Sequence, residues 1–420
     1  MVKTLKKLLY FPFASYFRFW AKIRLDNWKP KIVAITGSSG KTTLLHLIES
    51  QIGKKAKYSH HANSSYGIPF DILGLKRKTL TPDEWIYLFF LAPFKAFKPK
   101  PLEEIYVAEV DSDRPGEGKF LAELLNPEIT LWISSSLTHS ANFDSLVKEK
   151  NFTREEEAIA YDFGHFLEHT KKLAIVNGDN VFIQKELSRA KCPIEFTSEK
   201  DLKSWEVYKN RTEFIIDDKK YSINFITPKA TFNPIKMTNL LMKSLKLPLD
   251  ANFKNLILPP GRNSVFMGIK KTTIIDSTYN ATPEGVRTIL QMFDEYPSKN
   301  KWLVLGDMIE LGTREREEHE KLATAINCIA LEKIILIGPR VARYTYPKLS
   351  CQIDKIQKFL MPKEGLDYIL ENIKGEETIL FKGARFLEGI IEHLLQNKKD
   401  IDKLVRREKA WQKKRKSFGL

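Results

Sequence analysis

Short apolar runs recur along the chain and alternate with amphipathic stretches. Residues 31–37, KIVAITG, form such a run and end in glycine, and Leu44, Leu45 and Ile48 then recur at helical spacing. Further strand-like runs span residues 104–110, 128–135, 172–178, 272–278, 301–307, 333–338 and 377–383, and helical stretches span 284–295, 314–329 and 384–396. Because strands that alternate with helices form parallel sheets covered on both faces, the pattern predicts an α/β fold.

Residues 200–226 have a different pattern. Aromatic and polar residues alternate there around Asp217 and Asp218, which is typical of antiparallel hairpins. The strand–helix alternation restarts after LPPGRNS, residues 258–264, so we expect a domain boundary at this segment.

The first apolar run leads into TGSSGKTT, residues 36–43, which looks like a phosphate-binding loop that is one residue short. The usual P-loop has a glycine five residues before the glycine of its Gly-Lys pair. Here the pair is Gly40–Lys41, and the earlier position is Ile35. The loop is therefore either a nucleotide site of a different build or a glycine turn followed by an incidental lysine.

The residue types of the loop favour the first interpretation. Gly37 and Gly40 permit backbone amides to approach phosphate oxygens at a helix N-terminus. Lys41 would reach the β- and γ-phosphates, and the Thr42 hydroxyl would bind Mg²⁺. The apolar strand before the loop and the amphipathic helix after it make the incidental turn the weaker alternative.

The charge of the chain is concentrated at its ends. Of the formal net charge of +16, residues 1–31 contribute +7 from eight Lys/Arg and one Asp, and residues 397–420 contribute +7 from ten Lys/Arg and three acidic residues. The rest carries about +2, so we expect no nucleic-acid partner. The three cysteines lie far apart and outside any metal-binding spacing, which favours a reducing compartment and a cytoplasmic protein.

The N-terminal segment combines cations with aromatic residues. Its longest uncharged run, residues 8–17, is too short to span a bilayer and contains Pro12. Phe13, Phe17 and Trp20 share a helical face, and cations lie on another. Such a helix suits the surface of an anionic membrane, and it suits equally well packing on the body through its aromatic face. The basic C-terminal tail is most simply a solvated helix end.

Eight segments follow one another along the chain in a characteristic order. The first is the short loop TGSSGKTT. The others are NSSYGIP (63–69), VAEVDSDRPGE (107–117), SSSLTHSANFDS (134–145), PPGR (259–262), IDSTYNATPEG (275–285), GDMIELGTREREEH (306–319) and FKGAR (381–385). Each segment alone is a weak signal, whereas their order across residues 36–385 is specific. Together they resemble the Mur ligase superfamily, and the last three resemble its MurF-type branch.

The resemblance implies an ATP-dependent enzyme that forms amide bonds through acyl-phosphates. Lys41 would hold the phosphates, Thr42 and Glu109 would bind one Mg²⁺, and His139 would act near a second. The further nucleotide contacts that the family implies are Gly37, Ser38, Ser39, Gly40, Thr43, Asn233, Arg262, Asp276 and Asn280. Glu109 as a surface strand end, His139 as a loop histidine, and Asp276 with Asn280 as a turn-stabilising pair are the alternatives.

Two features depart from the MurF-type pattern. About 30 residues precede the loop, so we expect the family's N-terminal UDP-binding domain to be absent. Phe163 occupies the position of the family's carbamylated lysine, and His165 that of a glutamate. Asp162 and His165 are the candidate replacement ligands. Either the second metal is held differently, or catalysis is impaired.

These features predict a basic aromatic segment (1–30), a central P-loop ATPase domain (31–262), a Rossmann-like C-terminal domain (263–400) and a basic tail (401–420), with ATP in the cleft between the two domains. The leading hypothesis is a MurF-like ligase that joins an acidic acceptor, with a UDP-muramyl peptide as one candidate, to an amino acid or dipeptide. The alternatives are an amino-acid or poly-glutamate type ligase and a membrane-associated ATP-binding scaffold without ligase activity. Peripheral membrane contact through the basic termini is also predicted.

Overall fold

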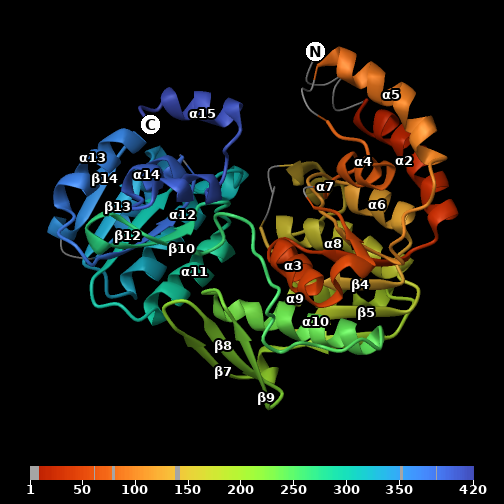
Figure 1. Ribbon diagram of the computed structural model, residues 1–420, viewed down its shortest axis with the longest axis horizontal. Coiled ribbons are helices and arrows are strands. Elements are labelled where there is room, and N and C mark those ends of the chain that lie inside the picture. Colours follow the sequence, from red (N-terminus) through yellow and green to blue (C-terminus); the bar gives the residue numbers. More distant parts are fainter. Residues whose placement is uncertain (1–8, 61, 78–80, 138–141, 351–352, 385) are drawn as a thin grey trace. The chain divides into compact units, whose positions relative to one another are not determined.

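The computed structural model describes residues 9–60, 62–77, 81–137, 142–350, 353–384 and 386–420. The chain divides into two compact units that are interleaved along the sequence (Figure 1). Unit 1 comprises Met1–Glu199 and Asn233–Asp250, and unit 2 comprises Lys200–Phe232 and Ala251–Leu420. The predicted α/β fold is confirmed, while the predicted domain limits stay a prediction.

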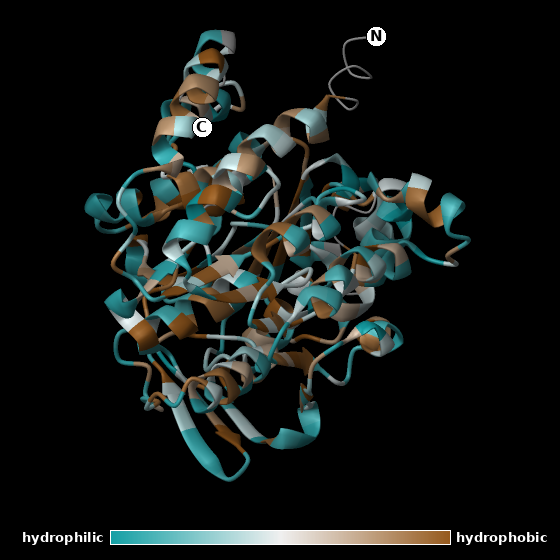
Figure 2. Cartoon of the chain, turned by 90° about the vertical axis from the view of Figure 1, so that its right-hand side faces the viewer, coloured by the Kyte–Doolittle hydropathy of each residue, from teal (hydrophilic) through white to brown (hydrophobic). Residues whose placement is uncertain are grey.

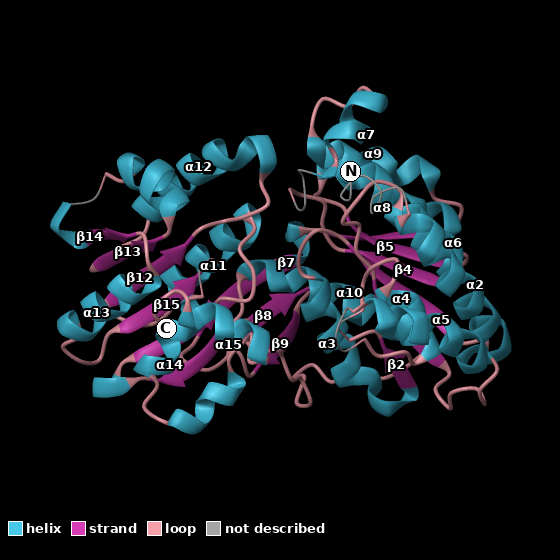
Figure 3. Cartoon of the chain, turned by 90° about the horizontal axis from the view of Figure 1, so that it is seen from above, coloured by secondary structure: helices cyan, strands magenta, loops and turns pink. Residues whose placement is uncertain are grey.

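Unit 1 contains a parallel sheet with helices on both faces (Figure 3). Its strand order is β2-β3-β1-β4-β5-β6, with bounds Ala56–Tyr58, Ile105–Glu109, Lys31–Thr36, Ile129–Trp132, Leu173–Asn177 and Ile194–Thr197. Its helices are α2 (Tyr10–Trp28), α3 (Lys41–Ile52), α4 (Gly67–Leu73), α5 (Pro82–Ala96), α6 (Glu117–Leu125), α7 (Asp144–Glu149), α8 (Glu155–His169), α9 (Val181–Glu186) and α10 (Phe232–Ser244).

The alternation of side chains along β1 builds a core on each face of this sheet. Val33 and Ile35 pack with apolar residues of α3 and α10. Ile32 and Ala34 face the other way, into a core shared with α2, α4, α5 and α6. Both sets are buried, so β1 reads as a continuous apolar run, as expected for a central parallel strand. Figure 2 shows this concentration of apolar residues, in brown, on the strands of the interior.

Unit 2 contains a mixed sheet and a small antiparallel one. The mixed sheet has the order β10-β11-β15-β12-β13-β14, with bounds Ser264–Met267, Thr273–Ser277, Thr378–Lys382, Lys301–Gly306, Lys333–Ile337 and Ile356–Phe359. Strand β10 is antiparallel to β11, and the other pairs are parallel. The helices are α11 (Pro283–Glu295), α12 (Glu315–Asn327), α13 (Pro362–Asn372), α14 (Leu387–Leu394) and α15 (Lys409–Lys416). Helices α11 and α12 cover one face of the sheet, and α13 and α14 cover the other.

The predicted hairpins between residues 200 and 226 are confirmed. Strands β7 (Leu202–Val207), β8 (Thr212–Ile216) and β9 (Lys219–Ile223) form an antiparallel sheet. Asp217 and Asp218 form the two-residue turn between β8 and β9, and both have positive φ, 46° and 63°. A tight hairpin turn requires that conformation, and aspartate tolerates it better than most residues.

The N-terminal aromatic segment forms α2, which packs into unit 1. The Phe17 ring contacts the rings of Phe70 and Phe89 at centroid distances of 4.7 and 4.8 Å. The Tyr16 hydroxyl donates to the Phe89 carbonyl oxygen at 2.8 Å, and Arg18 forms a 2.8 Å ion pair with Glu123. Of the two interpretations of this segment, packing on the body is the one that the structure shows. None of the described helices combines the length and apolarity needed to cross a bilayer.

We expect α2 to belong to the cooperative core of unit 1. Phe17→Ala should lower the free energy of unfolding by about 3–5 kcal/mol, because a fully buried ring leaves a cavity. Phe19→Ala is the matched control, since Phe19 lies on the same helix and is 57% exposed; its effect should stay within about 1 kcal/mol. Urea denaturation of the two variants measures the difference. Equal midpoints would show that α2 is not part of the core.

Candidate functional site

The loop between β1 and α3 depends on two glycines. Gly37 has φ 131° and Gly40 has φ 84°, values that other residues rarely adopt. A Cβ atom on Gly37 would lie 2.7 Å from the Ser134 carbonyl oxygen, and one on Gly40 would lie 2.8 Å from Cδ1 of Ile133. The loop therefore packs directly on the chain that follows β4, without room for side chains at these positions.

The serines of the loop anchor it to that segment. The Ser39 N–H donates to Oγ of Ser134 at 2.9 Å, and the Ser38 hydroxyl donates to the Ser136 carbonyl oxygen at 2.9 Å. The Ser136 N–H donates to Oγ of Ser38 in return, also at 2.9 Å. Helix α3 begins directly after Gly40, which offers no side chain to cap it. The first amides of α3, at Lys41, Thr42 and Thr43, thus face the region where an anion binds most readily.

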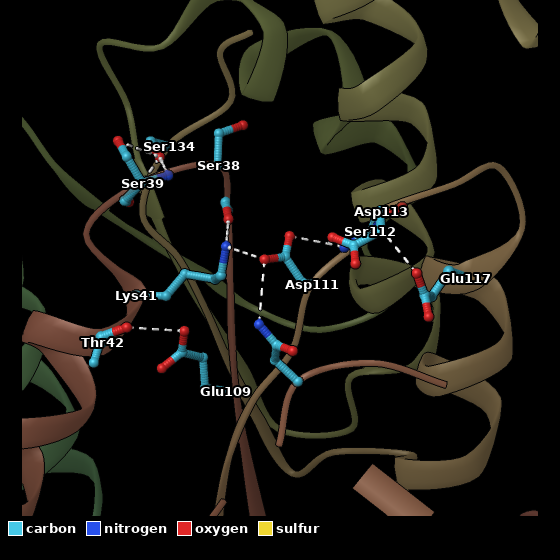
Figure 4. A network of polar contacts seen from close by, with 12 residues as sticks. Ser38, Ser39, Lys41, Thr42, Glu109, Asp111, Ser112, Asp113, Glu117 and Ser134 are labelled. Carbon is cyan, nitrogen blue, oxygen red and sulfur yellow. Dashed lines mark hydrogen bonds and ion pairs between the residues drawn. The ribbon is translucent and has the colours of Figure 1, made fainter. Parts of the chain in front are cut away.

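Lys41 is buried at the start of α3 and paired. Its Nζ donates to the Gly37 carbonyl oxygen and forms an ion pair of 3.0 Å with Oδ2 of Asp111 (Figure 4). Asp111 also accepts from the Ser112 N–H at 2.9 Å and from Nδ2 of Asn63 at 3.5 Å. The ammonium group is therefore held over the loop by a carboxylate that is itself fixed.

Sequence reasoning did not single out Asp111, although a signal for it existed. Strand β3 runs parallel to β1, with Glu109 level with Ile35. The residue two positions beyond Glu109 must then lie level with Gly37, beside the loop. Parallel pairing of the two apolar runs would have placed Asp111 at the site.

Thr42 and Glu109 lie together, while their role as Mg²⁺ ligands stays a prediction. The Thr42 hydroxyl donates to Oε1 of Glu109 at 3.0 Å (Figure 4), and the Glu109 N–H donates to Oγ of Ser59 at 2.8 Å. Adjacent ligands of an octahedral Mg²⁺ are about 3.0 Å apart when each lies about 2.1 Å from the ion. The two oxygens thus already have the separation and the chemistry that Mg²⁺ requires. His139, the predicted ligand near a second Mg²⁺, lies outside the described residues.

The segment from Asp111 to Gly118 is held by buried carboxylates. Glu117 accepts from the Ser65 N–H at 2.6 Å, the Asp113 N–H at 3.0 Å and the Tyr10 hydroxyl at 3.0 Å. Burial raises the pKa of the Glu117 carboxyl, and these amide hydrogen bonds oppose the shift. The segment that carries Asp111 is therefore tied both to α6 and to α2.

Phe163 and its neighbours on α8 take structural positions. The Phe163 ring is fully buried and lies edge-to-face on Trp132, with 6.3 Å between centroids. Asp162 accepts from the amides of Gly116 at 2.8 Å and Gly118 at 2.7 Å, and also from the Ser112 hydroxyl. Burial raises the pKa of Asp162, against these hydrogen bonds.

The second candidate replacement ligand, His165, is also engaged. Its Nδ1 lies 2.9 Å from Oε2 of Glu168. Asp162 and His165 thus have protein partners on α8 or beside it, and their predicted roles as metal ligands stay a prediction.

Asn233 lies in unit 1 near the start of α10 and contacts the segment that supports the loop. Its Nδ2 donates to the Ile133 carbonyl oxygen at 3.4 Å, and its Oδ1 accepts from the Thr197 hydroxyl. Ile133 is the residue that packs against Gly40. Asn233 therefore joins α10 and β6 to the segment that supports the loop.

In unit 2, the carboxyl ends of β11 and β15 bring several predicted residues together. Lys382 is fully buried, and its Nζ donates to the Asn280 carbonyl oxygen at 2.6 Å and to Oγ of Ser277 at 3.3 Å. Burial, together with the charge of the neighbouring Arg262, lowers the pKa of Lys382 to about 7, although Asp276 opposes the shift. Lys382 lies in the FKGAR segment, but sequence reasoning gave it no role.

Asp276 and Asn280 both make local turn contacts. Oδ1 of Asp276 accepts from the Thr278 N–H at 3.0 Å and the Thr278 hydroxyl at 2.7 Å, and burial raises the pKa of this carboxyl. The exposed Asn280 side chain accepts from the Ala281 N–H at 2.7 Å. The Arg262 guanidinium lies over the Tyr279 ring, 4.3 Å from its centroid. Asp276 and Asn280 therefore each stabilise a turn, as the alternative interpretation expected. A nucleotide role for Arg262, Asp276 and Asn280 stays a prediction.

Two residues of the GDMIELGTREREEH segment, Asp307 and His319, make buried hydrogen bonds that hold the structure together. His319 is buried, its Nδ1 lies 2.7 Å from the Glu315 carbonyl oxygen, and its Nε2 accepts from the Met308 N–H at 3.2 Å. Because a carbonyl only accepts, Nδ1 carries the proton and the ring is neutral. Asp307 accepts from the amides of Arg340 and Val341, each at 3.0 Å. The two side chains fix the loop that follows β12.

We expect His319 to make unit 2 sensitive to acid. Burial lowers its pKa below the ordinary 6.5, so the unfolded chain binds this proton first as the pH falls. The stabilisation is complete above pH about 6.5 and is lost below it. Between pH 7.5 and pH 5.5, the wild type should therefore lose about 1 kcal/mol more free energy of unfolding than His319→Asn does. Unfolding temperatures measured at both pH values for both proteins check this difference. Parallel curves would contradict a neutral, buried His319.

The fold and the loop define an α/β protein with a short P-loop at the carboxyl edge of a parallel sheet. Residues 35–241 match the model of the Mur ligase middle domain, and residues 261–385 match that of the Mur ligase glutamate ligase domain. The chain therefore belongs to the Mur ligase family, and the resemblance of the eight segments is confirmed.

Curated relatives and solved structures agree with this assignment. The chain is 26% identical to the UDP-N-acetylmuramoyl-tripeptide–D-alanyl-D-alanine ligase of Buchnera aphidicola, over 88% of this chain and 78% of the relative. It is 23% identical to the ligase of the same name from Bacillus subtilis, over 90% and 78%. The MurF ligase from Thermotoga maritima in complex with ADP has the same fold, with a TM-score of 0.73 at 24% identity over 93% and 84% of the two chains. MurF from Acinetobacter baumannii gives 0.74 at 20% identity over 91% and 80%.

Proposed function

We propose that this chain is an ATP-dependent amide ligase of MurF type that acts on a cell-wall precursor. The observation that carries the proposal is the arrangement around the short P-loop in a chain of this family. Lys41 is fixed by Asp111 above the loop, and Thr42 lies against Glu109 at 3.0 Å. Curated relatives that share most of this chain are named as ligases for D-alanyl-D-alanine, which supports the same substrate class here.

The proposed reaction has two balanced steps. An acceptor carboxylate oxygen attacks the γ-phosphorus of ATP, the bond to the bridging oxygen breaks, and ADP leaves. The amine nitrogen then attacks the carbonyl carbon of the acyl-phosphate, the carbon–oxygen bond breaks, and phosphate and a proton are released. Phosphoryl transfer of this kind depends on positioning and charge rather than on a covalent enzyme intermediate.

The residues of unit 1 supply positioning and charge for the first step. Lys41 would exchange the Gly37 carbonyl oxygen for a phosphate oxygen, while the α3 amides and the backbone of Gly37–Gly40 hold the others. Thr42 and Glu109 would hold one Mg²⁺, which supplies positive charge to the phosphates when bound. We further propose His139 near a second Mg²⁺, and Asn233, Arg262, Asp276 and Asn280 as nucleotide contacts.

Phe163 favours one rival function. The side chain at the family's lysine position is sealed in the core against Trp132 and cannot carry a carbamate. An ATP-binding scaffold without ligase activity is therefore the second candidate, and amine-dependent phosphate release separates the two. We also propose a cytoplasmic location and membrane contact through the basic termini. As substrates we propose a UDP-muramyl peptide as the acceptor and an amino acid or dipeptide as the amine.

Replacement of Lys41 tests the ligase. We expect the wild type to release phosphate from ATP only when UDP-muramyl tripeptide and D-alanyl-D-alanine are both present. Lys41→Met should lower this rate by about 100-fold or more, because it removes the charge at the γ-phosphate. Lys54→Met, just after the same helix, is the matched control and should keep the wild-type rate. A wild type that binds ATP but releases no phosphate with any acceptor–amine pair would support the scaffold instead.

Replacement of Thr42 tests the Mg²⁺ assignment. Thr42→Val keeps the shape of the side chain but removes the hydroxyl next to Glu109, so we expect the Mg²⁺-dependent part of ATP affinity to fall at least about tenfold. Thr42→Ser keeps the hydroxyl and should bind as the wild type does. Titration of a fluorescent ATP analogue with and without Mg²⁺ measures both. Identical Mg²⁺ dependence in Thr42→Val and the wild type would remove Thr42 from the metal site.

A further inference from the structure

Helix α5 presents an apolar stripe to the outside of unit 1. Ile86, Phe90, Phe94 and Phe97 follow one another at spacings of four, four and three residues, which places them on one side of the helix and the turn after it. Tyr87 adjoins them. Each of these five side chains is at least 60% exposed, although large apolar side chains are usually buried.

The opposite side of α5 is firmly packed, so the orientation of the helix is fixed. Leu88, Ala92 and Ala96 are buried. The Phe89 ring contacts Phe17 at 4.8 Å, and the Trp85 ring contacts Tyr66 at 5.4 Å. Figure 1 shows α5 on the outer side of unit 1, with α2 and α4 next to it. The stripe therefore cannot turn inward without breaking this packing.

Exposed aromatic residues of α2 extend the stripe. The Trp20 ring lies 6.2 Å from Phe97 and 5.0 Å from Phe19, which is itself largely exposed. Phe13 is about half exposed and contacts Phe89 at 5.7 Å. We call this surface the aromatic face; its residues are Phe13, Phe19, Trp20, Ile86, Tyr87, Phe90, Phe94 and Phe97. The aromatic face spans two helices, whereas exposed apolar residues on an ordinary protein surface are scattered singly.

Cations flank the aromatic face at both ends of α5. Residues 74–100 contain six Lys/Arg and two acidic residues. Lys76 and Arg77 precede the helix, Lys98 and Lys100 follow it, and all four are exposed. The two acidic residues, Asp83 and Glu84, lie in the first turn of the helix, where they offset its dipole.

We propose that the aromatic face docks this protein on an anionic lipid surface. Exposed aromatic side chains insert at the boundary between headgroups and acyl chains, and lysine and arginine attract anionic headgroups. Helix α5 has 15 residues and is about 22 Å long, shorter than the roughly 30 Å hydrocarbon core, so it lies in the membrane plane. A second copy of this chain is a poorer partner, because two such faces would bring their flanking cations together.

Vesicle flotation with the full chain tests the proposal. We expect binding to vesicles of phosphatidylcholine with 30% phosphatidylglycerol and weak binding to phosphatidylcholine alone, with an affinity that falls as salt rises. Phe90→Ser with Phe94→Ser should weaken binding at least about tenfold. Lys98→Glu with Lys100→Glu should weaken it by roughly fivefold per cation removed. Ile257→Ser with Met267→Ser is the matched control, because both residues are at least 64% exposed on unit 2, and it should bind as the wild type does.

Three further measurements separate the possible outcomes. The thermal unfolding midpoints of all variants should match the wild type, since no substituted side chain is buried; where a serine variant unfolds, the Lys98/Lys100 variant decides. Absence of binding to anionic vesicles, or equal binding by the wild type and the Phe90/Phe94 variant, would overturn the proposal. A dimer in light scattering that Phe90→Ser with Phe94→Ser dissociates would overturn it too and assign the face to self-association. With substrates dissolved in water, all variants should release phosphate at the wild-type rate. Membrane docking and the proposed ligase activity can therefore fail independently of each other.

Discussion

The parallel pairing of β1 with β3 on one side and β4 on the other is the constraint on which the site depends. It places Glu109 level with Ile35 and Trp132 level with Thr36, so the chain segments beyond both neighbours meet the glycine loop at the carboxyl edge. One neighbour then contributes Glu109 and Asp111, and the other contributes the support at Ser134. Open parallel sheets bind ligands at such edges because helix N-termini and strand ends converge there.

The same constraint places the partners that a buried lysine needs around Lys41. A buried ammonium group is costly unless it is paired, and Lys41 satisfies this through Asp111 and the Gly37 carbonyl oxygen. Asp111 is in turn fixed by the Ser112 amide and by Asn63. In the proposed function, a phosphate oxygen would replace one partner of Lys41 while the other partner kept the side chain in place.

Much of this arrangement could be predicted from the sequence, for identifiable reasons. The apolar runs at residues 31–37 and 104–110 predicted β1 and β3, whereas the pairing of Thr42 with Glu109 was predicted from the resemblance to the family. Asp111 was missed because its role follows from strand register, which the runs alone do not state. The short strands β2, β6, β10 and β14 were missed because they lie at sheet edges and are partly exposed. Periodicity also placed Phe13 and Phe17 on one face of α2, but it could not show that α5 covers Phe17 and leaves Phe13 half exposed.

Phe163 is best understood together with Asp162. The Phe163 ring is fully buried and packs on Trp132 at the end of β4. The adjacent Asp162 accepts from the amides of Gly116 and Gly118. Helix α8 thus supports the segment that carries Asp111 through hydrogen bonds. In the proposed reaction, the departure at position 163 would therefore affect the groups that hold the acyl-phosphate rather than the Lys41–Asp111 pair, which is formed in this structure.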